Sequence, residues 1–181
     1  MKVVAVLGSP HEQGPSTTLV NRILQGARDA GHETVVYEIN KMNVKGCQGC
    51  RACKKAGIDC VVQDDLQPYW RDLHQCGALI VSSPNYCAQV CGPMITYMNR
   101  HYCLLDANWK TRLEPGKKLI GVFAQGGAET PPLAQQNYEW FLGDFRSRGM
   151  QLVDTLIHTG GTSLALDSEL MQRAYALGKS L

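Results

Sequence analysis

Several signals of membrane, secreted and nucleic-acid-binding proteins are missing from this sequence of 181 residues. Its first apolar run, in MKVVAVLGSP, stops at Gly8, which is too short for a secretory signal or a membrane span, and no later run is longer. Only 19% of the residues are charged, the formal net charge is +2, and no basic stripe alternates with aromatic residues. We therefore expect a cytoplasmic protein that binds neither a membrane nor a nucleic acid.

Two glycine-rich nucleotide-binding motifs are also missing. The loop after the first apolar run lacks the GK[ST] ending of a P-loop, and it does not read G-x-G-x-x-G. These absences disfavour a P-loop nucleotide-binding protein and a dinucleotide-binding fold.

Buried-strand and helix patterns alternate along the whole chain. Five segments have the apolar, β-branched character of buried strands: 2–7, 33–39, 77–82, 118–124 and 151–157. Amphipathic stretches separate them, and crossovers between parallel strands are helical and right-handed. The pattern predicts one α/β domain over residues 1–181, with a doubly wound five-stranded parallel sheet and helices on both faces.

The loops that follow three of these strands contain the residues best suited to bind a ligand, because doubly wound sheets bind ligands beyond the carboxyl ends of their strands. The first loop offers hydroxyls and amides at a helix N-terminus, which suit a phosphate. Segment 83–92 is expected to be a loop against which a planar ring can lie, and the third loop lets the backbone approach a ligand closely. The candidate residues are Ser9, Pro10, His11, Ser16, Thr17 and Thr18, then Pro84, Asn85, Tyr86 and Cys87, then Gln125, Gly126 and Gly127. Each loop alone is compatible with a simple turn, but together they predict a flavin pocket.

Cysteine is abundant, with 8 residues, and four cysteines are clustered in a cysteine-rich loop at about 45–62. In a reducing cytosol, clustered thiols bind metal or perform redox chemistry more often than they form structural disulfides. The spacing Cys47-x2-Cys50-x2-Cys53-x6-Cys60 suits an iron–sulfur cluster, because short gaps let successive thiolates reach different irons. A four-cysteine zinc site and a C-x-x-C redox disulfide remain open as alternatives.

The same motifs resemble a known family. GSP at 8–10 with STT at 16–18, then SSPNY at 82–86 with CGPM at 91–94, resemble the NADPH-dependent FMN reductase branch of the flavodoxin-like superfamily. The cysteine run, with CVVxDD from Cys60, resembles the iron–sulfur flavoproteins of that superfamily. The resemblance implies the strand order 2-1-3-4-5, FMN with its phosphate in the first loop, and one [4Fe–4S] cluster on the four cysteines. It also implies NAD(P)H, ferredoxin or a quinone as redox partner, and a homodimer or homotetramer.

The function that we expect is that of an FMN-dependent oxidoreductase or electron-transfer iron–sulfur flavoprotein. Two other functions remain open at this point. One is a flavin or quinone reductase without a cluster, in which the cysteines are vestigial or bind zinc. The other is a redox-sensing flavodoxin-like protein whose cysteines oxidise reversibly. In each flavin-based function we expect no side chain to act as an acid–base catalyst, since the flavin performs the redox chemistry and the protein supplies geometry and electrostatics.

Overall fold

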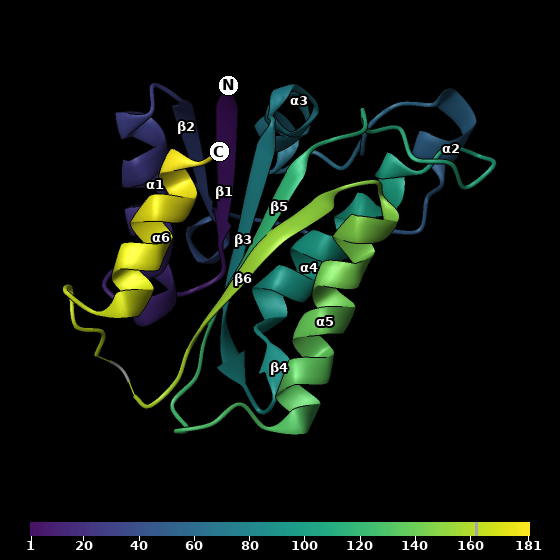
Figure 1. Cartoon of the computed structure of the whole chain (residues 1–181). Coiled ribbons are helices and arrows are strands. Elements are labelled where there is room, and N and C mark those ends of the chain that lie inside the picture. The colour runs from purple at the N-terminus through teal and green to yellow at the C-terminus, as the bar shows by residue number, and fades with distance from the viewer. Residues whose placement is uncertain (162) are drawn as a thin grey trace.

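The structure, a computed structural model, describes residues 1–161 and 163–181 and is built on a twisted β-sheet (Figure 1). Five parallel strands lie in the order β2-β1-β3-β5-β6, and β4 pairs antiparallel with the end of β3. The strands are β1 (Lys2–Leu7), β2 (Glu33–Glu38), β3 (Ala78–Tyr86), β4 (Gln89–Val90), β5 (Lys118–Ala124) and β6 (Gln151–His158). The α/β parallel sheet is therefore as predicted. When β4 is left out and the five parallel strands are numbered along the chain, their order is the 2-1-3-4-5 that the resemblance implied.

The predicted count of five strands is wrong, because β3 is longer than expected and turns back as a hairpin. β3 continues through Pro84 to Tyr86, and Cys87 and Ala88, both with positive φ, form the tight turn into β4. Proline marked this segment as a loop, but β1 stops pairing with β3 at Ser82, so Pro84 has a sheet neighbour on one side only. Pro84, Asn85 and Tyr86 consequently lie on a strand and not in a loop.

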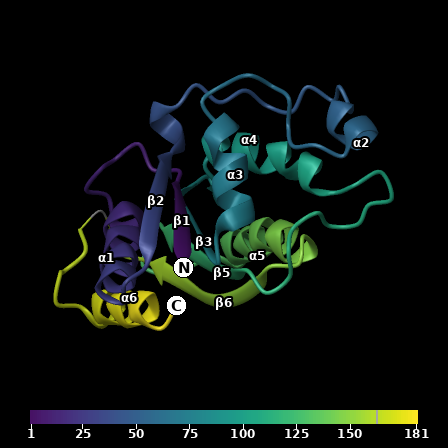
Figure 2. The same ribbon diagram turned by 90° about the horizontal axis from the view of Figure 1, so that it is seen from above.

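Helices cover both faces of the sheet, as Figure 2 shows. α1 and α6 pack on one face, and α3, α4 and α5 pack on the other. The helices are α1 (Pro15–Asp29), α2 (Ala52–Ala56), α3 (Gln67–Gln75), α4 (Gly92–Arg100), α5 (Pro132–Ser147) and α6 (Glu169–Lys179), with 3-10 turns η1 (Ile39–Lys41) and η2 (His101–Leu104). Within the described residues, no helix has both the length and the apolar character needed to cross a bilayer.

Two glycines set the distance between α1 and α6. A Cβ on Gly178 would lie 1.9 Å from the carbonyl oxygen of Ile23, and one on Gly26 would lie 2.2 Å from the carbonyl oxygen of Tyr175. The backbones of the two helices therefore touch, and a side chain at either glycine would force them apart.

We predict that Gly178→Ala lowers the free energy of unfolding by about 1–3 kcal/mol, the usual cost of overpacking. Gly143→Ala in α5 is the matched control, because a Cβ there would meet no atom of the described residues within 4 Å. Urea unfolding followed by circular dichroism measures both changes. The control is expected to be neutral or to stabilise by about 0.5–1 kcal/mol, since alanine favours helix. Equal unfolding midpoints for the two variants would contradict this account of the α1–α6 contact.

Candidate functional site

One pocket lies at the carboxyl ends of β1, β3 and β5, where the sequence predicted it. We call it the strand-end pocket, and it is an open hollow with a volume of about 180 Å³. It is lined by Ser9, His11, Gly14, Pro15, Ser16, Pro84, Asn85, Tyr86, Ala124, Gln125, Gly126 and Gly161.

The structure brings eight of the thirteen predicted residues to this pocket: Ser9, His11, Ser16, Pro84, Asn85, Tyr86, Gln125 and Gly126. The other five lie beside it. Pro10 lines the outer side of the first loop, and Cys87 is exposed at the tip of the β3–β4 hairpin. The hydroxyls of Thr17 and Thr18 donate to carbonyl groups within the first loop, and the carbonyl of Gly127 accepts the N–H of Gly160.

The first loop is held in shape by its own hydrogen bonds. The Thr17 hydroxyl donates to the carbonyl of His11 at 3.0 Å, and the His11 N–H donates to Ser9 Oγ at 3.1 Å. Gly8 begins the loop where a Cβ would lie 2.3 Å from Met94 Cγ, so only glycine fits there. No side chain of the described residues caps α1, and its first turn contains no acidic residue. The amides of this helix N-terminus therefore remain available to an anion at the pocket.

A hydrogen-bonded triad of Asn85, Tyr138 and Gln125 connects the side of the pocket formed by β3 with the side formed by the loop after β5. Asn85 Nδ2 donates to Tyr138 Oη at 2.6 Å, and Tyr138 Oη donates to Gln125 Oε1 at 3.0 Å. Tyr138 is buried in α5 and stacks on Phe123 with ring centroids 4.1 Å apart, and burial raises the pKa of its hydroxyl. The phenol therefore stays neutral and fixes the orientation of both amide side chains. The sequence contains no motif at Tyr138 that could have assigned it to the site.

The cysteine loop, residues 45–62, closes around a second, small cavity of about 10 Å³. We call it the thiol cavity, and it is lined by Cys47, Cys50, Cys53 and Cys60 together with Gln48, Arg51, Val61, Val62, Arg100, Tyr102 and Cys103. Positive φ angles at Gly49, Arg51 and Gly57 give the loop the sharp turns that it needs to curl around the cavity. All four motif cysteines thus line one space, and Cys103 is a fifth thiol that the spacing did not reveal.

The thiols are not arranged as a finished metal site. Within the described residues, no group of three or more His, Cys, Asp or Glu side chains is placed to hold one metal ion. Cys47 and Cys50 are exposed, Cys60 is half-buried and Cys53 is buried, and burial raises the pKa of Cys53. The iron–sulfur ligation that the spacing predicted therefore remains a prediction.

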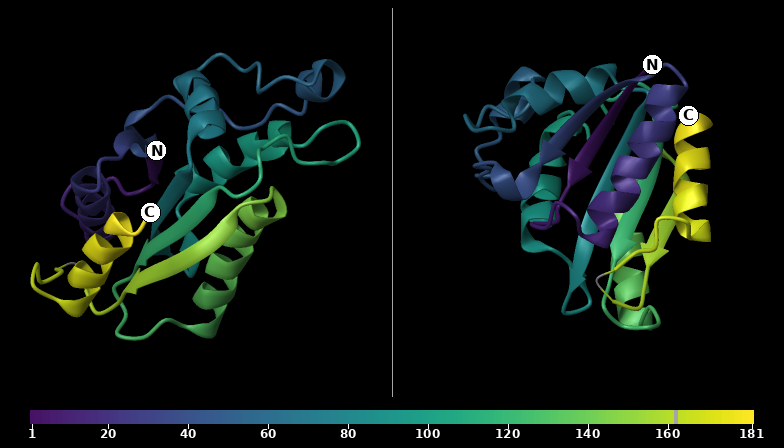
Figure 3. Two further views of the ribbon diagram at one scale, coloured as in Figure 1. Left: turned by 45° about the horizontal axis from the view of Figure 1, so that its top comes forward. Right: turned by 90° about the vertical axis from the view of Figure 1, so that its left-hand side faces the viewer.

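The two candidate sites lie at opposite ends of α4. At the N-terminal end, the Cys91 N–H donates to Ser83 Oγ at 2.8 Å and its thiol donates to the carbonyl of Gly8 at 3.2 Å. At the C-terminal end, Arg100 Nε donates to Cys60 Sγ at 3.2 Å. The helix has 9 residues, so it separates the sites by about 14 Å. Figure 3 shows the cysteine loop, coloured blue, extending away from the sheet.

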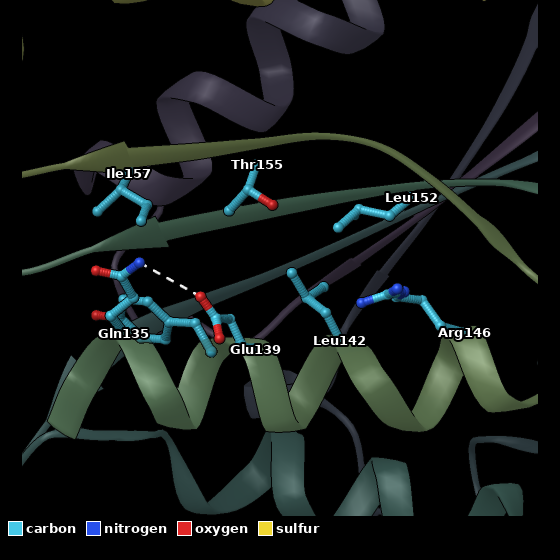
Figure 4. A pocket seen from close by; sticks show the side chains of 8 residues that line it. Gln135, Glu139, Leu142, Arg146, Leu152, Thr155 and Ile157 are labelled. Carbon is cyan, nitrogen blue, oxygen red and sulfur yellow. Dashed lines mark hydrogen bonds between the residues drawn. The ribbon is translucent and has the colours of Figure 1, made fainter. Parts of the chain in front are cut away.

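A third hollow lies between α5 and the edge strand β6 (Figure 4). It is lined by Gln135, Tyr138, Glu139, Leu142, Arg146, Leu152, Thr155 and Ile157. Its charged and amide side chains come from α5, and Gln135 donates to Glu139 at 3.3 Å within that helix. Its lining comes from one helix and one edge strand, so it resembles a groove at a sheet edge more than a reaction centre.

The doubly wound sheet and the strand-end pocket define a flavodoxin-like protein. A flavodoxin from the domain Archaea has the same fold, with a TM-score of 0.59, 14% identity, and coverage of 99% of this chain and 95% of that one. An azoreductase gives a TM-score of 0.75 at 16% identity, with both chains fully covered. At these identities the likeness concerns the fold alone.

The family follows from the sequence comparisons. Residues 1–138 match the family model described as NADPH-dependent FMN reductase. The chain belongs to this family and is an FMN-dependent oxidoreductase. An iron–sulfur flavoprotein of Methanocaldococcus jannaschii is 29% identical over 167 residues, which are 91% of this chain and 83% of the relative.

We predict that the cysteines of the metal-free protein react with iodoacetamide in the order of their exposure. Cys47, Cys50 and Cys87 are exposed and should be alkylated first, whereas burial raises the pKa of Cys76 to about 11 and that of Cys103 to about 12. Only the thiolate reacts, so the two buried thiols should react more than about 100-fold more slowly at neutral pH. Peptide mass spectrometry over time measures each rate. Labelling of Cys103 as fast as that of Cys47 would show that the thiol cavity is open in solution.

Proposed function

We propose that the chain is an iron–sulfur flavoprotein that binds FMN in the strand-end pocket and a [4Fe–4S] cluster in the thiol cavity. One observation carries the proposal: four cysteines spread over fourteen positions of the sequence line a single cavity. The membership of the family supports the flavin, and the names of the curated relatives support the cluster.

The strand-end pocket offers chemical groups that suit FMN. The uncapped N-terminus of α1, with the Ser9 and Ser16 hydroxyls beside it, would hold the phosphate. The amides of Asn85 and Gln125 would bond the polar edge of the ring. A Cβ on Gly126 would meet no atom of the described residues within 4 Å, so the backbone there is open to close approach by a ligand.

The thiol cavity fits a cluster in its donor set and its charge. Four cysteine sulfurs are the ligands that [4Fe–4S] clusters use, and Arg51, Lys54 and Arg100 lie on or beside the loop to offset the negative charge of thiolates. When bound, the flavin accepts two electrons and the cluster carries one at a time. The residues of the chain would hold the two groups, orient them and limit access of water.

NAD(P)H is the electron donor that we propose, and a quinone or a ferredoxin is the acceptor. The length of α4 between the two sites favours a homodimer or homotetramer, in which the thiol cavity of one chain can approach the strand-end pocket of another. Sedimentation of the holoprotein measures the oligomeric state. In a monomer, the strand-end pocket and the thiol cavity would stay apart by the length of α4.

Tyr138→Phe is expected to raise the dissociation constant of FMN about fivefold, because it removes one hydrogen bond that orients Asn85 and Gln125. Tyr175→Phe is the matched control, since its hydroxyl bonds Asp29 on the surface at 2.8 Å. Quenching of flavin fluorescence on titration gives both constants. Equal affinities for Tyr138→Phe and the wild type would show that the triad does not shape the flavin site.

Protein that is purified without oxygen and reconstituted with iron and sulfide is expected to show flavin peaks with a broad shoulder that dithionite bleaches. Cys50→Ser should remove the iron and leave FMN bound, because serine is a poor ligand for the cluster. Cys87→Ser, at the exposed hairpin tip, should retain both. Flavin peaks alone, or zinc in place of iron in the metal analysis, would refute the cluster. Full iron content in Cys50→Ser would refute Cys50 as a ligand, and a colourless protein would refute the flavin as well.

A further inference from the structure

Arg100 is a buried cation at the end of α4 that contacts the cysteine loop. Its side chain is 0% exposed, as is that of its partner Asp64. A buried guanidinium requires a partner for its charge and for each of its five N–H donors. The groups that supply these partners show what the residue holds in place.

Every partner of Arg100 belongs to the cysteine loop or to the residues that follow it. Nη1 donates to the carbonyl of Lys45 at 2.8 Å and to Asp64, and Nη2 donates to the carbonyl of Val62 at 3.3 Å. Nε donates to Cys60 Sγ at 3.2 Å. Lys45 precedes the first motif cysteine, and Val62 and Asp64 follow the last one, so both ends of the loop meet at this one side chain.

The bond to Cys60 differs from the others because it ends on a sulfur of the motif. A hydrogen bond from a cation is stronger than one from a neutral donor. In proteins with iron–sulfur clusters, hydrogen bonds to the ligating sulfurs and nearby charge help to set the reduction potential. A positive group that bonds a ligating sulfur stabilises the reduced cluster, which is the more negative form.

We propose that Arg100 is the positioning residue of the thiol cavity: it fixes Cys60 as a cluster ligand and raises the reduction potential of the cluster. This inference rests on the proposed function, since it needs a cluster on the four cysteines. Arg100 does not touch the flavin pocket, and its effect acts through Cys60.

Arg112 provides a matched comparison within the same part of the structure. Its Nη1 donates to Asp59 at 3.2 Å and to the carbonyl of Cys103 at 2.9 Å, so it also ties the cysteine loop to the segment after α4. It has no bond to a motif sulfur among the described residues. A role that is only structural would be shared by the two arginines, whereas an effect on the cluster would belong to Arg100.

The test compares Arg100→Lys and Arg112→Lys with the wild type as FMN-bound protein, reconstituted with iron and sulfide without oxygen. Lysine keeps the charge beside Asp64 but has no planar fork to reach Cys60, Lys45 and Val62 together. The readouts are iron and sulfide per chain, FMN per chain, and the midpoint potential of the cluster from a redox titration followed by electron paramagnetic resonance.

We expect Arg100→Lys to retain FMN, to hold half or less of the iron of the wild type, and to shift the potential of the remaining cluster to a more negative value. Arg112→Lys should match the wild type in all three. If Arg100→Lys does not fold, the double variant Arg100→Met with Asp64→Asn removes the ion pair as a unit and leaves no buried charge unpaired, and it should show the same shift.

The outcomes separate the two proposals. A wild type that takes up no iron refutes the cluster, and the inference fails with it. A wild type with a cluster, together with an Arg100 variant of unchanged iron content and potential, overturns the inference alone. Equal shifts in the Arg100 and Arg112 variants would assign the effect to general loosening of the loop and would also overturn it.

Discussion

Parallel pairing of β1, β3 and β5 is the constraint on which the strand-end pocket depends. Leu7 pairs with Ser82, Ser82 with Val122 and Pro84 with Ala124, so three loops that are far apart in the sequence leave the sheet at one edge. Parallel strands need long crossovers that return the chain to the opposite edge, and those crossovers place helices over both faces. The same pairing therefore creates the ligand pocket and the two apolar layers that stabilise it.

Burial of charge is the second constraint, and it acts at the far end of α4. Arg100 is fully buried, and the free energy of an unpaired buried cation would be prohibitive, so the chain must bring Asp64 and several carbonyls to it. Gly8 and Ser83 therefore fix the N-terminal end of α4, and the cysteine loop fixes its C-terminal end. Its length makes the spacing of the two sites a property of the fold.

The sequence predicted those parts of the structure that depend on local pattern. The strand at 118–124 was predicted with its observed bounds, because a buried parallel strand is a continuous apolar run. The cysteine spacing predicted that four thiols of one short loop lie close to one another, and the structure lines one cavity with them. Tyr138 and Arg100 were missed because their roles come from contacts with residues far away in sequence. The β3–β4 hairpin was missed because Pro84 is normally a sign that a strand has ended.

The cysteine loop lies within the crossover between β2 and β3, before α3. A segment inserted into a crossover leaves the strand register unchanged, and the entropy of closing a loop rises only slowly with its length. The strand register of the doubly wound sheet therefore does not depend on this segment. Arg100 ties this segment to α4: without residues 45–62 its side chain would keep Asp64 but lose its bonds to Cys60, Lys45 and Val62. Gain or loss of the cysteine loop therefore requires a coupled change on α4, a helix that contains none of the four motif cysteines.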